Sequence, residues 1–271
     1  MKFLAITLIT DSRDPVTGAP TPTRERFREV VAAARLAEQL GFDGFGVGER
    51  HERPFLSSSP PVVLGHIAAL TRRIRLFTAV TTLRAEVLPR PFQRNLRVWH
   101  GSATSRESVD LAARYGDPLF SANVTHPIGP YAELIRYYRE RWEHYGHDPA
   151  HAVVGAGTAG YHAAPTSQQA VRAYRPAFAR YLAFHEEQGL EPVFPTLEDF
   201  VERSSALIGS PQQVIEKVHR YHEEFGHTAL HLQAEAGGLT PAEHRASLEL
   251  FQSEIAPVLR RAIPDPSFPH S

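Results

Sequence analysis

The stretch AEQLGFDGFGVGE, residues 37–49, decides the fold, because it runs from an amphipathic helix through a glycine into a short apolar strand. Two further stretches follow the same plan, AARYGDPLFSAN at 112–123 and HEEFGHTALHLQAE at 222–235. In each, the glycine marks the end of the helix, and the apolar run after it has the length of one buried strand. This repeated helix–glycine–strand pattern predicts an α/β protein whose parallel sheet is covered by helices.

Two helix starts support this interpretation. SPQQ at 210–213 and TPAE at 240–243 each place a hydroxyl residue before proline, with Gln or Glu three residues after the hydroxyl. The apolar runs predict seven strands, at Phe3–Ile9, Gly44–Gly48, Arg75–Thr82, Leu96–Gly101, Pro118–Ala122, Val153–Tyr161 and Thr228–Ala234.

A barrel is favoured over an open sheet. No G-x-G-x-x-G fingerprint follows the first strand, as an open dinucleotide-binding sheet would require. The expected architecture is therefore a (β/α)₈ barrel of TIM type, formed by residues 1–271 as one domain. The stretch 188–210 breaks the pattern and is expected to be an excursion or lid.

Composition excludes several classes of partner and site. The 271 residues contain 29 Lys and Arg against 30 Asp and Glu, a formal net charge of −1, so neither nucleic acid nor an anionic membrane is an expected partner. The absence of cysteine excludes disulfides and thiolate chemistry and is compatible with a reducing cytoplasm. No apolar stretch approaches the roughly 20 residues that span a bilayer, so a soluble, cytoplasmic protein is expected.

The first candidate site follows the second predicted strand. Active sites of parallel barrels lie at the carboxyl ends of the strands, and there VGERHERPFLSSSPP at 47–61 supplies Glu49, Arg50 and His51. A carboxylate, a guanidinium and an imidazole could orient and protonate a substrate, which makes the three a candidate catalytic group. They could equally form a structural ion pair between Glu49 and Arg50, with His51 capping the loop.

A second candidate lies in HGSATSRES at 100–108. Thr104 and Glu107 have the spacing of a capping box, which predicts a helix start at Thr104, with Ser102, Ser105 and Ser108 around it. Free backbone N–H groups, the helix dipole and several hydroxyls suit an anion such as phosphate. Serines also cap helices for local reasons, so both interpretations stay open.

Weaker signals come from the third strand and from histidine. Thr78, Ala79 and Val80 are small enough to let a flat ring approach the backbone, but such residues are also ordinary strand formers. The chain has 15 histidines, among them His227 and His231 on one predicted strand, without an accompanying carboxylate set. A metal-dependent barrel hydrolase is therefore a third alternative, and no metal ligands are predicted.

Four segments, in this order, resemble the bacterial-luciferase-like family of flavin-dependent monooxygenases. They are AEQLGFDGFGVGERH (37–51), SSSPPVVLGHIAALTRRIRLFTAVTTL (57–83), VLPRPFQRNLRVWHGSATSRESVDLAARYGDPLFSAN (87–123) and LIGSPQQVIEKVHRYHEEFGHTALHLQAEAGGL (207–239). The resemblance implies a TIM-type barrel that uses reduced FMN and O₂ on a small organic substrate. It also implies a separate NAD(P)H-dependent flavin reductase and, from family habit, a homodimer. Some members use the deazaflavin F420, and FMN is the preferred cofactor here.

The resemblance also gives roles to the candidate residues. Ser105 and Ser108 match positions that contact the FMN phosphate in the family, with Ser102 and Thr104 nearby. Ala79 and Val80, which follow Thr78, match a strand-end bulge beneath the isoalloxazine ring.

The family's Glu-His-His stretch is altered in this chain. Glu49 and His51 match its acid and its second histidine, whereas Arg50 stands where the first histidine is catalytic in luciferase itself. The implied chemistry is therefore flavin monooxygenation or plain flavin oxidoreduction rather than light emission.

A larger departure from the family follows Leu83. Where the family continues into a helix, a fourth strand and another helix, TTL here runs directly into RAEVLPRP. A whole βα segment, on the order of 80 residues at the usual size of such a barrel, is missing. The barrel is expected to lack strand four, and a non-catalytic flavin-binding protein derived from the family is the alternative function.

Overall fold

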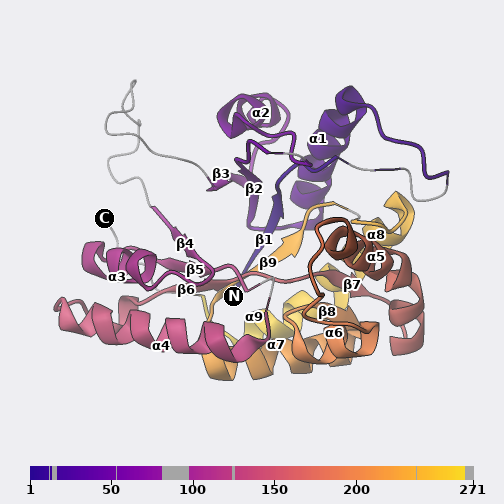
Figure 1. Ribbon diagram of the computed structural model, residues 1–271. Helices are drawn as coiled ribbons and strands as arrows, with labels where there is room; N and C mark the ends of the chain where they lie inside the picture. The colour runs from indigo at the N-terminus through magenta and orange to yellow at the C-terminus, as the bar shows by residue number, and fades with distance from the viewer. Residues whose placement is uncertain are drawn as a thin grey trace.

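A seven-stranded parallel sheet forms the centre of the computed structural model (Figure 1), which describes residues 1–11, 13, 17–52, 54–80, 98–123, 126–235 and 237–265. The strand order is β3-β2-β1-β9-β6-β5-β4, and every neighbouring pair is parallel. The strands are β1 (Lys2–Thr7), β2 (Gly44–Gly48), β3 (Arg75–Val80), β4 (His100–Ser102), β5 (Leu119–Ser121), β6 (Val154–Ala156) and β9 (Ala229–Gln233). A curled, all-parallel sheet of this kind is a half-barrel of TIM type, as predicted.

The sheet is open between β3 and β4, which stand at the two ends of the strand order. The chain that joins them, residues 81–97, lies outside the described residues, as do the predicted strand ends at 81–82 and 96–97 and the junction after Leu83. These 17 residues are too few for a helix, a strand and a second helix between β3 and β4, because a single βαβ unit already takes about 30 residues. The expected TIM-type fold without one internal βα segment is therefore confirmed.

The predicted strand Val153–Tyr161 is wrong as a single strand. Its first part is β6, and its last residue begins β7 (Tyr161–Ala163), which pairs with β8 (Leu207–Gly209) in a separate two-stranded parallel sheet. Gly157 and Gly160 bound the four residues between β6 and β7, where the strand is interrupted. Strands of three residues are too short to show a hydrophobic period, so β7 and β8 left no signal of their own.

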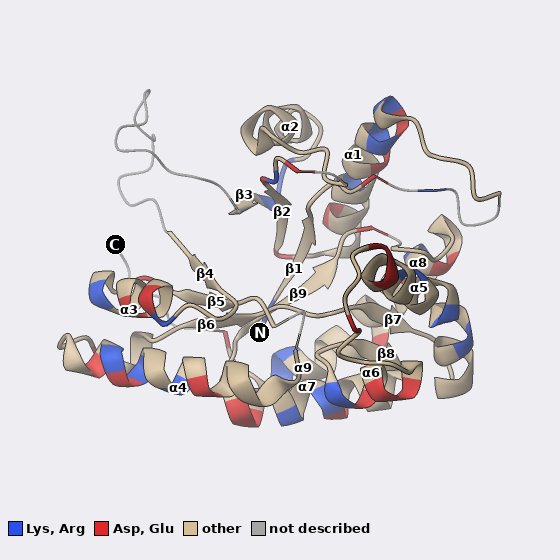
Figure 2. Ribbon diagram, in the orientation of Figure 1, with Lys and Arg blue, Asp and Glu red and all other residues tan. Residues whose placement is uncertain are grey.

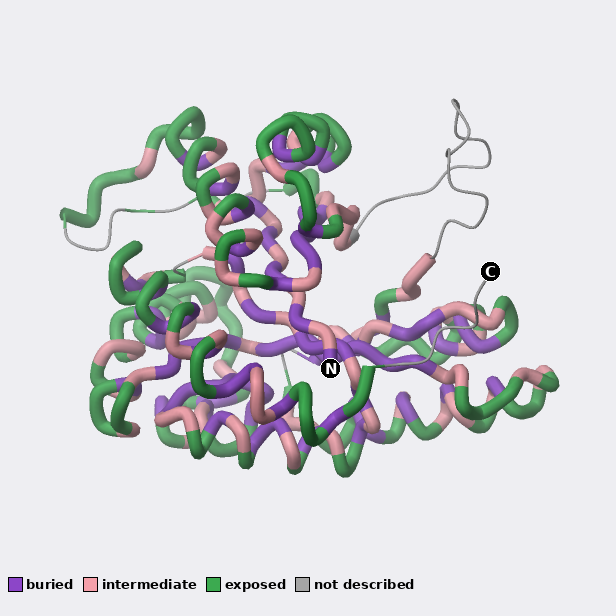
Figure 3. Tube along the Cα trace, turned by 180° about the vertical axis from the view of Figure 1, so that it is seen from behind, coloured by how far each residue is buried: buried purple, intermediate pink, exposed green. Residues whose placement is uncertain are grey.

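Helices cover the sheet on its outer side, with α4 and α7 side by side below it and α1 and α2 above in Figure 1. Charged residues are concentrated in these helices (Figure 2), while buried residues are concentrated in the strands at the centre of the fold (Figure 3). No helix in the described ranges is long and apolar enough to cross a membrane. The helices are α1 (Thr23–Leu40), α2 (Pro60–Ala68), α3 (Arg106–Tyr115), α4 (Ile128–His144), the 3₁₀ helix η1 (Pro149–His151), α5 (Ser167–Glu187), α6 (Leu197–Arg203), α7 (Pro211–Phe225), α8 (Pro241–Leu250), the π-helix η2 (Phe251–Ile255) and α9 (Ala256–Ala262).

The predicted helix ends are confirmed. Gly41, Gly116 and Gly226 follow α1, α3 and α7 with φ of 80°, 68° and 58°, the left-handed conformation that glycine adopts without steric cost. Ser210 and Thr240 form complete capping boxes at the starts of α7 and α8.

Glycine in the fold-deciding stretch is needed for packing. A Cβ at Gly46 would lie 2.5 Å from the Phe77 ring on neighbouring β3. Only glycine, which has no side chain, therefore lets β2 and β3 pack together at this position.

Residues 167–209, from α5 to β8, form a unit that we call the annex. Its own hydrophobic cluster joins Phe178 of α5 to Phe194 and to Leu197 and Phe200 of α6, all buried. The predicted excursion at 188–210 is thus packed on α5 and contains α6 and β8. Its action as a lid, and the single-domain assignment, stay predictions.

Candidate functional site

The loop after β2 carries the predicted catalytic group. His51 Nε2 lies 2.7 Å from Glu49 Oε1, and the exposed imidazole contrasts with a carboxylate side chain that is only 18% exposed. Arg50 is engaged elsewhere, because its guanidinium pairs with Glu52 and lies 4.5 Å from the ring centroid of Phe55. The structure therefore brings Glu49 and His51 together and leaves Arg50 in a separate surface cluster.

β3 ends in a bulge at the predicted position. Val47 of β2 pairs with Thr78, but the next residue, Gly48, pairs with Val80, so Ala79 is the additional residue. Bulges are common at the rims of barrels and next to active sites, where they redirect the chain. The predicted strand-end bulge is confirmed, and its contact with a flavin ring stays a prediction.

The turn after β4 differs by one residue from the prediction. Ser105, not Thr104, is the N-cap of α3, and its Oγ accepts the N–H of Ser108 at 3.1 Å. The buried Ser102 donates its hydroxyl to the carbonyl of Ser105 at 3.0 Å. Thr104 and Ser105 both precede a suitable helix start, and Ser105 has the extended backbone that a cap requires. The Thr104 and Ser108 hydroxyls make no hydrogen bond to the described residues and could bind an anion.

The candidate residues form two groups at the carboxyl edge of the sheet. Residues 49–51 and 78–80 follow or end β2 and β3, while residues 102–108 follow β4. Because β3 and β4 are the two ends of the strand order, the groups stand on the two sides of the opening. The structure brings residues together within each group, and the opening separates the groups.

Two buried polar side chains at this edge were missed by the sequence analysis. Ser57 Oγ and both amide atoms of Asn123 have no hydrogen-bond partner among the described residues, although each of the two residues is only 1% exposed. The carbonyl of Ser57 accepts the N–H of Arg50 at 2.9 Å, and Asn123 follows β5 next to Gly157. An unpaired buried polar group costs about 1–3 kcal/mol, so ligand or water atoms would stabilise both. Asn123 directly follows the predicted strand Pro118–Ala122, the same signal that identified Glu49.

Backbone strain occurs at the same edge. Ile9, just after β1, has a φ of 47°, a conformation that β-branched residues avoid. Its N–H donates to Thr7 Oγ1 at 2.9 Å and its carbonyl accepts the N–H of Leu56 at 2.8 Å. Such strain persists where the surroundings impose it and is concentrated near functional sites.

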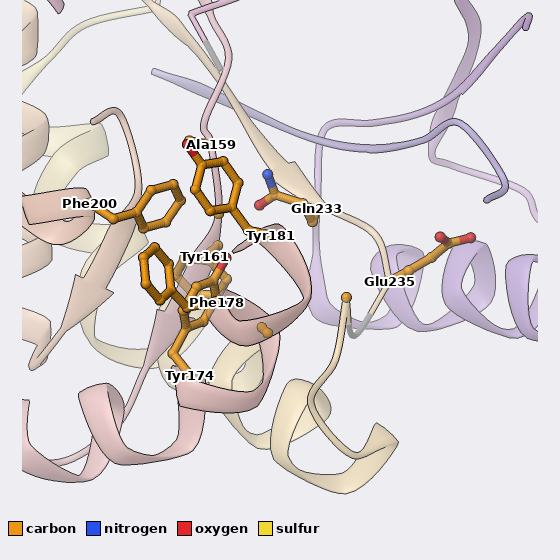
Figure 4. A pocket seen from close by; sticks show the side chains of 11 residues that line it. Ala159, Tyr161, Tyr174, Phe178, Tyr181, Phe200, Gln233 and Glu235 are labelled. Atoms are coloured by element: carbon orange, nitrogen blue, oxygen red, sulfur yellow. The ribbon is translucent and has the colours of Figure 1, made fainter. Parts of the chain in front are cut away.

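An aromatic pocket of about 220 Å³ lies between the annex and the ends of β6 and β9 (Figure 4). Tyr174, Phe178 and Tyr181 of α5 and Phe200 of α6 form one wall, opposite Gln233 at the end of β9. The Phe200 ring centroid lies 5.5–6.2 Å from the centroids of the other three rings. These residues come from distant parts of the chain, so no local motif predicted the pocket.

Gln233 keeps part of its hydrogen-bonding capacity. Its Nε2 donates to the carbonyl of Thr158 at 2.7 Å, and its Oε1 accepts the Thr158 hydroxyl at 3.2 Å. A side-chain amide has two N–H donors and two lone pairs, so one of each remains for a ligand.

The aromatic pocket carries no unpaired charge on its described lining. Glu235 points away from the rings in Figure 4, accepts the Thr7 hydroxyl at 2.7 Å and pairs with Arg26 NH2 at 2.9 Å. Burial raises the pKa of Tyr174 to about 12, so its hydroxyl stays protonated at neutral pH. Burial also lowers the pKa of His231 on β9 to about 4, which keeps that imidazole neutral.

Solved structures share this fold along almost the whole chain. Monooxygenase RslO1 from Streptomyces bottropensis is 19% identical with a TM-score of 0.75, covering 95% of this chain and 99% of that one. The oxygenating constituent of 3,6-diketocamphane monooxygenase from Pseudomonas putida, in complex with FMN, is 17% identical with a TM-score of 0.71, covering 95% and 98%. Other proteins with this fold are coenzyme F420-dependent. At these identities the likeness establishes the fold.

Sequence comparison adds the family. The uncharacterized protein YwcH of Bacillus subtilis (strain 168) is 46% identical over 96 residues, so the match spans 35% of this chain and 28% of that protein. The family model described as luciferase-like monooxygenase matches residues 1–86 and 83–228. The two matched segments meet beside Leu83, where the sequence departs from the family pattern. The chain therefore belongs to the luciferase-like monooxygenase family.

Proposed function

We propose that this protein is a flavin-dependent monooxygenase or oxidoreductase that uses reduced FMN and O₂ on a small organic substrate. The carrying observation is the carboxyl edge of the half-barrel, where the Glu49–His51 pair, the β3 bulge and the α3 turn flank one opening. Family membership and an FMN-bound structural neighbour support the cofactor. Because F420-dependent proteins share the fold, FMN is the preferred cofactor of the proposal.

The residues present fit a flavin. Thr104 and Ser108, with the first turn of α3, would hold its phosphate, and the unpartnered amide of Asn123 could donate to and accept from the ring's polar edge. When bound, reduced FMN supplies the electrons for oxygen activation. Glu49 holds His51 Nε2 at 2.7 Å, so this imidazole can exchange a proton between solvent and a ligand.

The proposal includes a partner and a location. A separate NAD(P)H-dependent flavin reductase would supply reduced FMN in the cytoplasm. A homodimer is proposed only because members of the family commonly form one.

Ser105→Ala is expected to weaken FMN binding by about 1 kcal/mol, or about fivefold, measured by quenching of FMN fluorescence. The substitution removes the cap that orders the turn expected to hold the phosphate. Ser210→Ala is the matched control, because it removes an equivalent cap from α7. Both variants should lose about 1 kcal/mol of unfolding free energy, and only Ser105→Ala should lose FMN affinity. Unchanged FMN affinity in Ser105→Ala would remove the α3 turn from the site.

The non-catalytic alternative is favoured by the missing strand-four segment and by Arg50 in place of a histidine. Consumption of NAD(P)H and O₂ should be measured with a flavin reductase, FMN and a panel of small cyclic and linear substrates. An enzyme should convert at least one of them to an oxygenated or oxidised product. Stoichiometric flavin binding without such conversion supports the alternative.

A further inference from the structure

We propose that the aromatic pocket is the substrate subsite, and that it takes a neutral compound of one or two rings with one hydrogen-bonding group facing Gln233. This inference rests on the proposed function in one respect, because only that function makes the bound compound a substrate. Binding to the pocket itself needs no flavin.

The volume limits the occupant. An apolar cavity of about 150 Å³ is large enough to bind benzene. The aromatic pocket, at about 220 Å³, therefore accommodates a substituted single ring or a compact bicyclic compound. An extended alkyl chain would project out of it.

The wall favours a flat ring. The planes of Tyr174 and Phe200 are 15° apart, and those of Phe178 and Tyr181 are 23° apart. Aromatic rings attract one another in offset-stacked and edge-to-face geometries at centroid distances of about 4.5–7 Å. A ring that lies against the wall formed by these four side chains can make such contacts.

The electrostatics favour a neutral occupant. The carboxylate of Glu235 is already satisfied by Arg26 and Thr7. A cation would meet no free carboxylate among the described lining residues, and an anion would meet no cation there, because Arg180, which lies near Tyr174, is outside the lining. A charged ligand would therefore lose much of its hydration without full compensation, which is strongly unfavourable.

Two donors define the place of the polar group. Gln233 has one N–H and one lone pair left after its contacts with Thr158. The Tyr174 hydroxyl makes no hydrogen bond to the described residues and stays protonated. A carbonyl or hydroxyl oxygen on the ring would accept from these groups.

The rim of the aromatic pocket is connected to the carboxyl edge. The N–H of Ala159 donates to Ser205 Oγ at 2.8 Å, and Ser205 donates to the carbonyl of Asn123. The occupant therefore lies beside the loop whose unpartnered amide was assigned to the cofactor.

Fluorine NMR of 4-fluorophenol with the flavin-free protein tests the proposal, with competition by benzoate and by 1-decanol. 4-Fluorophenol should bind, and each competitor should bind at least about tenfold more weakly than it. Equal or tighter binding of the anion or of the linear alcohol would overturn the assigned class.

Ala177→Phe locates the binding. Ala177 is buried on α5 and lines the aromatic pocket, so a phenyl group there should weaken 4-fluorophenol binding at least about tenfold. Ala179→Phe makes the same change on the exposed face of α5 and should leave the affinity within about twofold. Unchanged affinity in a folded Ala177→Phe protein would place the ligand elsewhere.

A second variant keeps the test valid if Ala177→Phe does not fold. Gln233→Met keeps an unbranched side chain of similar volume but removes both the donor and the acceptor, so it should also weaken 4-fluorophenol binding, by about tenfold. If the protein binds 4-fluorophenol but not FMN, the proposed function alone is refuted. If the protein binds FMN but not 4-fluorophenol, the pocket assignment alone is refuted. The same holds if the Ala177 and Gln233 variants both leave 4-fluorophenol affinity unchanged.

Discussion

Arg26→Met is expected to lower the free energy of unfolding by about 3–5 kcal/mol. The Arg26 side chain is 5% exposed, pairs with Glu235 Oε2 at 2.9 Å and donates its Nε to the carbonyl of Thr10 at 3.0 Å. Methionine fills a similar volume but leaves Glu235, only 19% exposed, without its cation. Urea denaturation at pH 7 measures the loss.

Two controls separate the buried charge from general damage. Arg28→Met breaks an exposed pair with Glu25 on the same helix and should cost no more than about 1 kcal/mol. Adding Glu235→Gln to Arg26→Met removes the carboxylate that has lost its cation. The double variant should therefore recover part of the lost free energy of unfolding. If Arg26→Met costs no more than Arg28→Met, the buried pair does not stabilise the protein as argued.

Lys217→Met is expected to change the pH dependence of stability by about 2 kcal/mol between pH 7 and pH 9. Lys217 of α7 is 6% exposed and donates its ammonium to the carbonyl of Val201 in α6. Burial lowers its pKa from 10.5 to about 7. Between pH 7 and 10.5 the unfolded chain keeps this proton while the folded protein releases it, so wild-type stability rises with pH in that window. Below pH 7 the full cost of burying the ammonium is present.

The measurement is urea denaturation at pH 7, 8 and 9. The wild type should gain stability relative to Lys217→Met at each step. Lys2→Met is the matched control, because Asp265 raises the pKa of Lys2 and no proton is released in this range. Parallel curves for wild type and Lys217→Met would show that the buried amine does not titrate in this window.

Local signals predicted much of the fold. Gly41, Gly116 and Gly226 end their helices, and Ser210 and Thr240 cap theirs, because these motifs depend on residues within one helical turn. The position of Glu49, Arg50 and His51 after a strand was a local signal of the same kind, but the expected ion pair of Glu49 with Arg50 was wrong, because Glu49 contacts His51 and Arg50 pairs with Glu52.

The rest depended on contacts that sequence order does not show. The capping-box spacing with Glu107 predicted Thr104 as the cap of α3, whereas the backbone conformation makes Ser105 the cap. The unpaired amide of Asn123 reflects burial by distant loops. The aromatic pocket joins α5, α6 and β9, and the three-residue strands β7 and β8 pair with each other across a sequence separation of more than 40 residues.

The annex and the half-barrel have separate hydrophobic clusters, and the aromatic pocket lies where they meet. The pocket's rings belong to the annex cluster and the Gln233 amide to β9 of the half-barrel, so we expect the annex to open locally while the half-barrel stays folded. A ligand that bridges both would oppose this opening by RT ln(1 + [L]/Kd), about 2.7 kcal/mol at a hundredfold excess over Kd. Amide hydrogen exchange in α5 and α6 would slow accordingly. The exchange rate of the annex would therefore report the fraction of the protein that has ligand bound in the pocket.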